Sequence, residues 1–213
     1  MSQGAKKEKR EMTCFTIGHS DHSFSYFVEL LKKYDIDSLI DIRSMPYSQR
    51  IPQFNKEIFS ADLKSQNILY GYFGNRLGGR YTNPDLLFEN GKVDYNKVKK
   101  TQNFIIGIEK IIKGIKEHHR IALMCSEKDP FDCHRFILVA CVLEERGVTI
   151  KHILEDGNYV LNKDLERKLL NKYKFDYQQF CMFVESRTKK DALDEALKRR
   201  NLEIAFSINE GKK

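Results

Sequence analysis

Short apolar runs alternate with segments of helical periodicity along most of the chain. Residues 14–20 (CFTIGHS) form a β-branched and aromatic run that ends in Gly-His-Ser, which is typical of a buried strand followed by a turn. In residues 23–35 the apolar positions recur at helical spacing, and Ser23 is a suitable N-cap. The same pattern predicts further strands at 38–44, 68–74, 120–125 and 148–153, and further helices at 56–67, 95–119 and 134–147, the last ended by Gly147.

This alternation predicts an α/β fold: a mainly parallel, Rossmann-like sheet of about five strands with helices on both faces. Residues 158–213 instead contain polar helical segments and indicate a helical C-terminal extension. We therefore divide the chain into a charged N-terminal tail (1–11), an α/β domain (12–157) and this extension. The long loop 75–92 could serve as a lid. Its Gly78 and Gly79 either relieve backbone strain or let backbone amides approach a ligand.

The 213-residue chain is basic, with a net charge of +7, but the charge lies mainly at its ends. Residues 1–13 contribute +2, residues 14–157 contribute +1 and residues 158–213 contribute +4. This distribution is explained by charged tails and helix faces that are exposed to solvent. A nucleic-acid-binding surface on the C-terminal helices, for example at Lys198, Arg199 and Arg200, stays open as an alternative.

Three features indicate a cytoplasmic protein that does not enter a membrane. The sequence has no apolar run of 18 residues, and its N-terminus is charged rather than signal-like. The five cysteines are odd in number and irregularly spaced, unlike a secreted disulfide framework. Three of them have apolar surroundings and are predicted to be core residues: Cys14, Cys141 and Cys181.

Polar residues gather where the predicted strands end. In an open parallel sheet these carboxyl ends share one edge, and ligands bind in the crevice outside it. The residues placed at this edge are Gly18, His19 and Ser20 after the first strand, Asp41 and Arg43 after the second, Cys125 after the fourth and His152 near the end of the fifth. Asp41 and Arg43 could also form a simple ion pair on one face of their strand, and His19 could be a turn histidine.

The stretch 122–136 (ALMCSEKDPFDCHRF) carries the densest chemistry. Cys125 ends a strand, and Cys133, His134 and Arg135 open a helix. A thiol that faces a helix N-terminus and an arginine is acidified and can become a nucleophile. A thiol-phosphatase loop is disfavoured by the three acids Glu127, Asp129 and Asp132.

Three further roles for this stretch stay open. A metal could be bound by Cys125, Cys133, His134 and His19. However, C-x7-C-H is not a standard zinc spacing, and adjacent Cys and His rarely ligate together. We therefore predict no metal ligands. Cys125 and Cys133 could form a reversible disulfide. Alternatively, Cys125 only packs in the core and Asp132 caps the following helix.

The motifs GHS, DIR, LGGR and CSEKDPFDCHR occur in an order and at separations that resemble the DUF488 family, a domain of unknown function, over about residues 12–157. The resemblance implies an α/β fold but no reaction, although some members have been suspected of acting in nucleic-acid or nucleotide metabolism. It also implies that the family's signature residues are His19, Asp41, Arg43, Cys125, Glu127, Cys133, His134 and Arg135.

We expect an enzyme, a cysteine- or metal-dependent hydrolase or transferase, with its site at the carboxyl edge of the sheet. The substrate would be anionic, such as a nucleotide or a nucleic-acid end, and the cofactor is left open. The expected catalytic residues are Cys125, Glu127, His134 and His19, and the expected substrate-binding residues are Arg43, Asp41, Arg135, Ser20, Gly78 and Gly79. The alternatives are a nucleic-acid-binding module and a purely structural Cys/His or metal site.

Overall fold

The computed structural model describes residues 11–175 and 188–209. At its centre is a six-stranded sheet with the order β3-β2-β4-β1-β5-β6. All neighbouring strands are parallel except β6, which is antiparallel to β5. The strands are β1 (Thr13–Gly18), β2 (Ser38–Asp41), β3 (Leu69–Tyr72), β4 (Ile121–Cys125), β5 (Thr149–Ile153) and β6 (Tyr159–Leu161). The predicted α/β fold with a mainly parallel sheet is confirmed.

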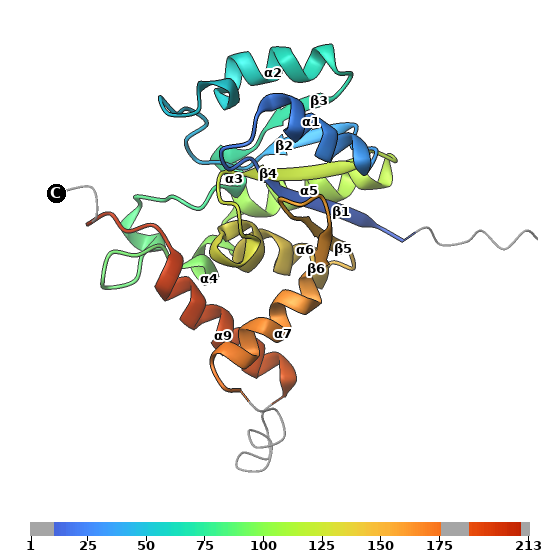
Figure 1. Ribbon diagram of the computed structural model, residues 1–213. Helices are drawn as coiled ribbons and strands as arrows, with labels where there is room; N and C mark the ends of the chain where they lie inside the picture. The colour runs from blue at the N-terminus through green and yellow to red at the C-terminus, as the bar shows by residue number, and fades with distance from the viewer. Residues whose placement is uncertain (1–10, 176–187, 210–213) are drawn as a thin grey trace, which may run out of the picture.

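Helices cover both faces of this sheet (Figure 1). One face packs against α1 (Phe24–Lys33) and α2 (Lys56–Ser65), and the other against α5 (Gln102–Lys116) and α6 (Cys141–Glu145). Beyond α6 lie α7 (Asn162–Lys172) and α9 (Lys189–Ile204), which pack against each other. The short elements are α3 (Gly74–Leu77), α4 (Tyr95–Val98), a π-helix at Arg135–Ala140, and 3-10 turns at Pro52–Phe54, Pro84–Leu86 and Pro130–Asp132.

The central strand β4 is buried on both faces, as expected of a strand in the middle of a parallel sheet. Ala122 and Met124 join the apolar cluster under α1 and α2, whereas Leu123 and Cys125 join the cluster under α5 and α6. This alternation places Cys125 at the carboxyl end of β4, on the face that the π-helix also covers. Cys14 and Cys141 are buried as predicted, while Cys181 lies outside the described residues.

The single long helix predicted at 95–119 is wrong, because the chain breaks between α4 and α5. Thr101 begins α5 as its N-cap, and its hydroxyl accepts a hydrogen bond from the backbone N–H of Phe104 at 3.3 Å. A side chain that caps a new helix in this way competes with continuation of the old one.

The helix predicted at 134–147 also differs in kind. Its first part, Arg135–Ala140, is π-helical, and only Cys141–Glu145 is α-helical. The predicted stop is correct, since Gly147 has a φ of +81°, the left-handed conformation of a C′ glycine.

The antiparallel strand β6 was missed, because residues 158–213 were assigned to helices alone. The signal was present in the sequence: Asp156-Gly157 precedes the apolar residues of β6, and Asp-Gly is a strong hairpin turn. Gly157 has a φ of +76°, and the Leu154 N–H donates to the Asn158 carbonyl at 2.8 Å.

The long loop 75–92 contains backbone pairing of its own, and its role as a lid stays a prediction. Leu87 forms an antiparallel bridge with Val93 across a turn at Gly91, whose φ is +78°. Lys92 in turn bridges Ser207, so the chain after α9 pairs with this turn. Among the described residues, no helix has the length and apolar character needed to cross a membrane.

Candidate functional site

The carboxyl ends of β1, β2 and β4 lie side by side. Gly18 is in register with Cys125, and the backbone N–H of His19 donates to the Cys125 carbonyl at 2.9 Å. On the other side, the Ile42 N–H donates to the Met124 carbonyl at 3.0 Å. The three strands therefore deliver their first loop residues to one small region, the usual ligand-binding edge of a parallel sheet.

Gly18 lets the loop after β4 cross over β1. A Cβ at this position would lie 1.9 Å from the Glu127 carbonyl oxygen, so no other residue fits without moving the loop. Arg135 holds the same loop: its guanidinium donates to the carbonyls of Glu127 at 2.7 Å and Lys128 at 2.8 Å. Arg135 is fully buried and faces these carbonyls, whereas the sequence suggested that it would contact substrate.

The loop turns back through the 3-10 turn at Pro130–Asp132. Asp129 caps this turn by accepting a hydrogen bond from the Phe131 N–H at 2.8 Å. Asp132 instead pairs with Arg200 of α9. The alternative in which Asp132 caps the following helix is therefore wrong.

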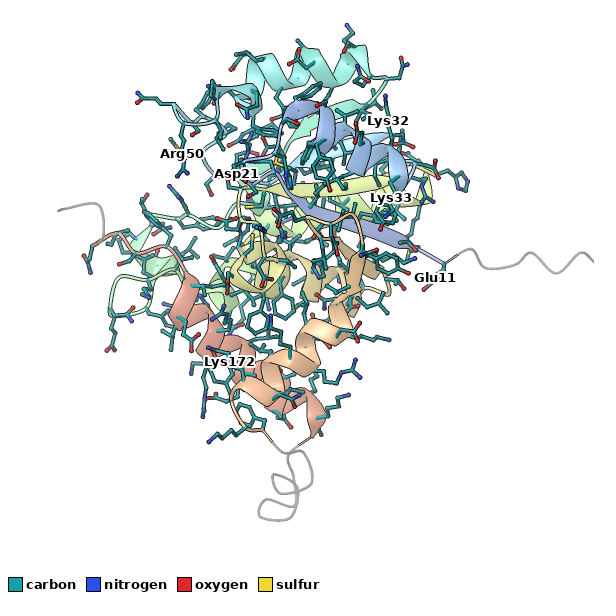
Figure 2. The ribbon with its side chains drawn as sticks, viewed as in Figure 1. Glu11, Asp21, Lys32, Lys33, Arg50 and Lys172 are labelled. Atoms are coloured by element: carbon teal, nitrogen blue, oxygen red, sulfur yellow. The ribbon has the colours of Figure 1, made fainter. Side chains whose placement is uncertain are left out.

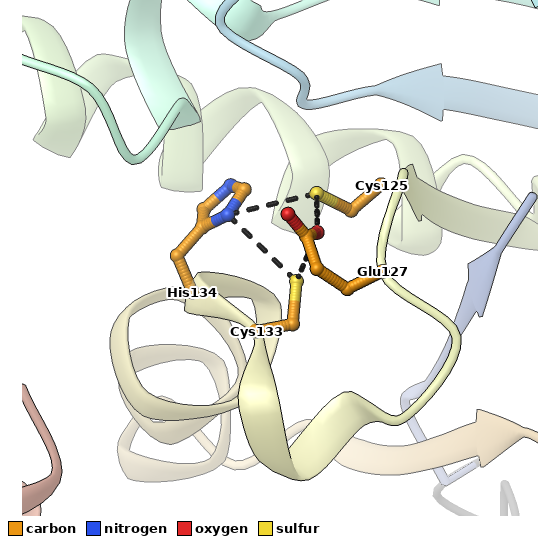
Figure 3. A group of neighbouring side chains, drawn as sticks. All are labelled: Cys125, Glu127, Cys133 and His134. Carbon is orange, nitrogen blue, oxygen red and sulfur yellow. Dashed lines mark hydrogen bonds between the residues drawn. The ribbon is translucent and has the colours of Figure 1, made fainter. Parts of the chain in front are cut away.

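Four side chains of this loop converge on one point (Figure 3). The sulfurs of Cys125 and Cys133 lie 2.7 and 3.1 Å from the Glu127 Oε2. The same sulfurs lie 3.6 and 3.8 Å from the His134 Nδ1. All four ligand-type atoms are within 4.8 Å of one another. In the sequence, the adjacency of Cys133 and His134 was an argument against a metal site. In the structure, the two side chains nevertheless face the same point.

A backbone carbonyl fixes the orientation of the His134 ring. The Nε2 of His134 lies 3.2 Å from the Ile42 carbonyl oxygen, which can only accept, so Nε2 carries the proton. In the neutral ring, Nδ1 then presents its lone pair to the two sulfurs. Metal-ligating histidines are held in this way by their second nitrogen.

The cluster is acidified by its own members. Burial alone would raise the pKa of the Cys125 thiol, but the Cys133 thiol and His134 outweigh it and lower this pKa to about 6. Burial, together with the Cys125 sulfur beside it, raises the pKa of Cys133 well above its usual range. Burial opposes ionisation of Glu127 too, yet His134 and the two thiols lower its pKa to about 2. Burial opposes protonation of His134, but the Cys125 sulfur and Glu127 outweigh it and raise the pKa of this ring, so the thiol becomes more acidic as the imidazole becomes more basic.

A second polar group, built around Arg43, lies beside this cluster. Its guanidinium forms a buried ion pair with Asp41 at 2.6 Å and also donates to the Phe54 carbonyl at 2.8 Å. The Tyr70 hydroxyl donates to the same carboxylate, at 2.7 Å from Oδ2. The ion pair that the spacing of Asp41 and Arg43 suggested is therefore present.

His19 belongs to this second group and not to the cysteine cluster. Its Nδ1 lies 2.8 Å from the Ser20 carbonyl, so its Nε2 is free to accept from the Arg43 Nη1 at 3.1 Å. Burial and then the Arg43 charge lower the pKa of His19 to about 4 and keep the ring neutral. The metal set that included His19 does not form. Ser20, with a φ of +46°, only turns the chain, and its hydroxyl donates to Asp21.

A polar cavity of about 260 Å³ opens onto both groups. Five of the predicted catalytic and substrate-binding residues line it: Arg43, Gly79, Cys125, Glu127 and His134. The sequence analysis missed Arg80, Tyr95 and the segment 204–206, which line the same cavity. Arg80 stands inside the LGGR motif and could have been found there, whereas nothing in the sequence pointed to 204–206.

Gly78 and Gly79 are required by close packing. Neither has a positive φ in this structure, so the suggestion that they relieve backbone strain is wrong. A Cβ on Gly78 would meet the Gly74 carbonyl oxygen and the Ser44 hydroxyl, each at 2.4 Å. A Cβ on Gly79 would press against the His134 ring at 2.9 Å.

His152 does not reach the cavity, although its strand ends at the same edge. Its Nδ1 lies 2.7 Å from the Thr16 hydroxyl, and its Nε2 lies 3.1 Å from the Asn162 side-chain oxygen. It is a fully buried core histidine whose polar atoms are both satisfied.

The fold and this cluster define an α/β protein with a Cys-Glu-Cys-His group at the carboxyl edge of a parallel sheet. The chain belongs to the DUF488 family: the family model described as "Domain of unknown function DUF488" matches residues 23–142, more than half of the chain. The match is shorter than the resemblance over 12–157, and it begins after β1 and His19. Neither a curated protein nor a solved structure matches the chain.

Proposed function

We propose that this protein is a metal-dependent enzyme that performs hydrolysis or group transfer on a small anionic substrate. The observation that carries the proposal is the convergence of four ligand-type atoms, from Cys125, Glu127, Cys133 and His134, within 4.8 Å of one another beside a polar cavity. Two sulfurs, one imidazole nitrogen and one carboxylate oxygen form a donor set that suits zinc.

The burial of the four ligands favours a catalytic over a purely structural centre. Cys125, Cys133 and His134 are buried, whereas Glu127 is exposed overall and lines the cavity, although its carboxylate faces the two sulfurs. Catalytic zinc sites commonly have three protein ligands, for example two cysteines and a histidine, and leave the fourth position to water or substrate. We assign the three buried residues to metal binding and Glu127 to an exchangeable position, where it can also accept a proton.

Charge balance supports the same assignment. Two thiolates and a carboxylate around a divalent cation leave one net negative charge. Arg135 is fully buried, and within residues 11–175 and 188–209 it forms no ion pair with a carboxylate. A buried charge is costly unless it is compensated. The anionic centre next to Arg135 would compensate it.

Arg43 supplies the contact for an anionic substrate. A guanidinium has five N–H donors. Four of them are committed, to Asp41, to the Phe54 carbonyl and to His19. One N–H on Nη1 remains, and Arg43 lines the cavity. The bound metal would polarise the substrate and lower the pKa of a bound water, and Arg43 would hold the substrate's negative charge beside it.

The first test is the metal content of untagged protein purified under reducing conditions, measured by elemental mass spectrometry. We expect about one zinc per chain. A structural zinc site is worth about 10–16 kcal/mol, or ~3 kcal/mol per ligand, so Cys125→Ser or Cys133→Ser should weaken zinc binding by ~100-fold.

The matched control is Cys141→Ala, which removes a buried cysteine outside the cluster and should leave the zinc content unchanged. A wild-type protein that stays metal-free after reconstitution with zinc would sink the metal proposal. Activity would then be sought by incubating loaded and chelated protein with nitrophenyl phosphate esters and nucleotides. The proposal expects turnover only with the loaded form.

One observation favours a second candidate, a cysteine-nucleophile enzyme without metal. The Cys125 sulfur lies 3.6 Å from His134, and its pKa is lowered to about 6, as in thiolate–imidazole pairs. Metal-free protein would then react with iodoacetamide at Cys125 with a rate that rises through pH 6. Zinc-loaded protein that is protected from alkylation would favour the metal centre.

The nucleic-acid alternative has less support, because two of its three basic residues, Lys198, Arg199 and Arg200, are paired with acidic side chains. Arg200 is buried and pairs with Asp132 and Glu203, and Arg199 pairs with Glu195. Of the three, only Lys198 is left without an acidic partner within the described residues.

A further inference from the structure

The last residue of α9 and the chain that follows it form one wall of the cavity. Ile204, Ala205 and Phe206 line it together with the cysteine cluster. The segment is held there by backbone pairing: the Val93 N–H donates to the Phe206 carbonyl at 3.0 Å, and the Ile208 N–H donates to the Gly91 carbonyl at 3.1 Å. This wall lies outside the matched family range.

The end of α9 fastens this segment to the ligand loop. Arg200 is buried and donates to the Phe131 carbonyl, in the loop between Cys125 and Cys133. The Asn201 side chain accepts from the Tyr95 N–H and donates to the Val93 carbonyl, both at 2.8 Å. Phe206 is therefore positioned by the same contacts that connect α9 to the site.

The ring of Phe206 packs against an arginine, Arg80, that lines the cavity. The guanidinium of Arg80 lies over the Phe206 ring, 5.4 Å from its centroid. The Arg80 backbone is fixed by a hydrogen bond from its N–H to the Ser44 hydroxyl at 3.0 Å, and Arg80 directly follows Gly79, which packs on His134. Within residues 11–175 and 188–209, no carboxylate forms an ion pair with this guanidinium, although it is exposed and lines the cavity.

We propose that Arg80 binds the oxyanion group of the substrate and that Phe206 is the residue that positions it. The inference rests on the proposed function, because it takes the cavity beside the metal-ligand cluster as the substrate site. A planar guanidinium stacked on an aromatic ring keeps its N–H edge directed outwards, and that edge matches phosphate or sulfate in a bidentate way. With both Arg43 and Arg80 in its lining, a cavity of about 260 Å³ would select small substrates with a phosphate-like group.

The test measures binding of inorganic phosphate to the full-length, zinc-loaded protein by isothermal titration calorimetry. Arg80→Ala should weaken phosphate binding by at least tenfold, since it removes a charge-assisted bidentate contact. Phe206→Ala should weaken it several-fold, and Phe206→Tyr should restore it. In the Arg80→Ala background, Phe206→Ala should have no further effect, because Phe206 acts only through Arg80.

The matched control is Arg50→Ala, which removes an exposed arginine outside the cavity (Figure 2). The inference is overturned if Arg80→Ala binds phosphate like the wild type, or if Arg50→Ala loses as much. An effect of Phe206→Ala that persists without Arg80 overturns the positioning role. Zinc content measured on the same samples separates this result from the proposed function: a full complement of zinc without phosphate binding refutes the inference alone, and absent zinc refutes the metal centre.

Discussion

Asp41 and Cys125 lie near the ends of adjacent strands, but the polar groups around them differ in what they lack. Around Asp41, donors and acceptors are matched: Arg43 and Tyr70 donate to the carboxylate, and His19 accepts from Arg43. Around Cys125, the facing atoms are two sulfurs, a carboxylate oxygen and an imidazole lone pair. The first group lacks a partner only for one Nη1 N–H of Arg43, whereas the second is rich in electrons and poor in donors.

This difference separates two tasks at one sheet edge. Matched buried networks rigidify their surroundings, and unmatched ones are costly unless something else satisfies them. Thiols are weak donors, so protons satisfy the cysteine group poorly and a cation satisfies it well. We therefore expect the Asp41–Arg43 ion pair to control mainly the stability of the fold and the cysteine group to control metal binding.

The largest expected effect comes from removing Asp41 from its buried ion pair with Arg43. Asp41→Ala leaves Arg43 buried without its partner, which should lower the free energy of unfolding by about 3–5 kcal/mol. Urea unfolding measures this loss, and zinc content should stay near one per chain wherever the variant is folded. Asp41→Asn keeps the shape of the side chain if the alanine variant fails to fold.

The matched control is Glu117→Ala, which removes the exposed partner of Lys113. Exposed pairs of this kind contribute at most ~0.5 kcal/mol. If Asp41→Ala cost no more than this control, or if it removed zinc from a stably folded protein, the separation of the two groups would be wrong.

A smaller effect is expected from acid. Burial lowers the pKa of His19 to about 4 and that of His152 to about 3, both below the ordinary value of 6.5. Because the unfolded chain binds these protons first, stability is complete above pH 6.5 and falls as the pH drops towards the folded pKa values. His152→Gln should remove on the order of 3 kcal/mol of this loss between pH 6.5 and 4.

Urea titrations of the wild type and the variant across this pH range measure the difference. The control is His118→Gln, at an exposed histidine, and a loss of pH dependence as large as that of His152→Gln would refute the assignment to the buried ring. If the free energy of unfolding fell equally with pH in the wild type and in His152→Gln, the buried His152 ring would not be the group that opposes protonation.

The smallest expected effect comes from Gly79, which packs against His134 of the cysteine group. A Cβ at Gly79 would press on the His134 ring at 2.9 Å and shift its Nδ1. Gly79→Ala should therefore weaken zinc binding by ~10-fold, in the range seen for residues that orient a metal ligand. A competition titration with a chromogenic chelator measures this change. Gly114→Ala, on α5 and outside the cavity lining, should leave zinc affinity unchanged, and equal losses in both variants would refute the support role.

The sequence allowed the sheet and much of the site to be predicted because both depend on local pattern. The buried run of β4 and its neighbours predicted parallel strands, and parallel strands have their carboxyl ends together. That rule was sufficient to bring Arg43 and Cys125 to one cavity. It failed for His152, because a side chain near a strand end can still point into the core, and position along a strand does not give direction.

The remaining parts depend on contacts between distant residues. Nothing local indicates that Phe206 lies over Arg80, or that Asp132 pairs with Arg200 rather than capping a helix. The inward direction of Arg135 is equally non-local, since it depends on the path of the loop over Gly18. Spacing rules for metal ligands also did not indicate this cluster, because they describe short loops and do not anticipate a π-helix directly after His134.

That π-helix makes the site depend on chain length as well as on residue identity. A π-helix closes its turns with one residue more than an α-helix, and such wide turns are rare and often found at functional sites. Each residue in an α-helix turns the chain by about 100°. Loss of one residue from 136–140 would restore an α-helix and rotate His134 by about that angle relative to α6. A relative could therefore keep all four ligand residues and still lack the site through a single-codon deletion.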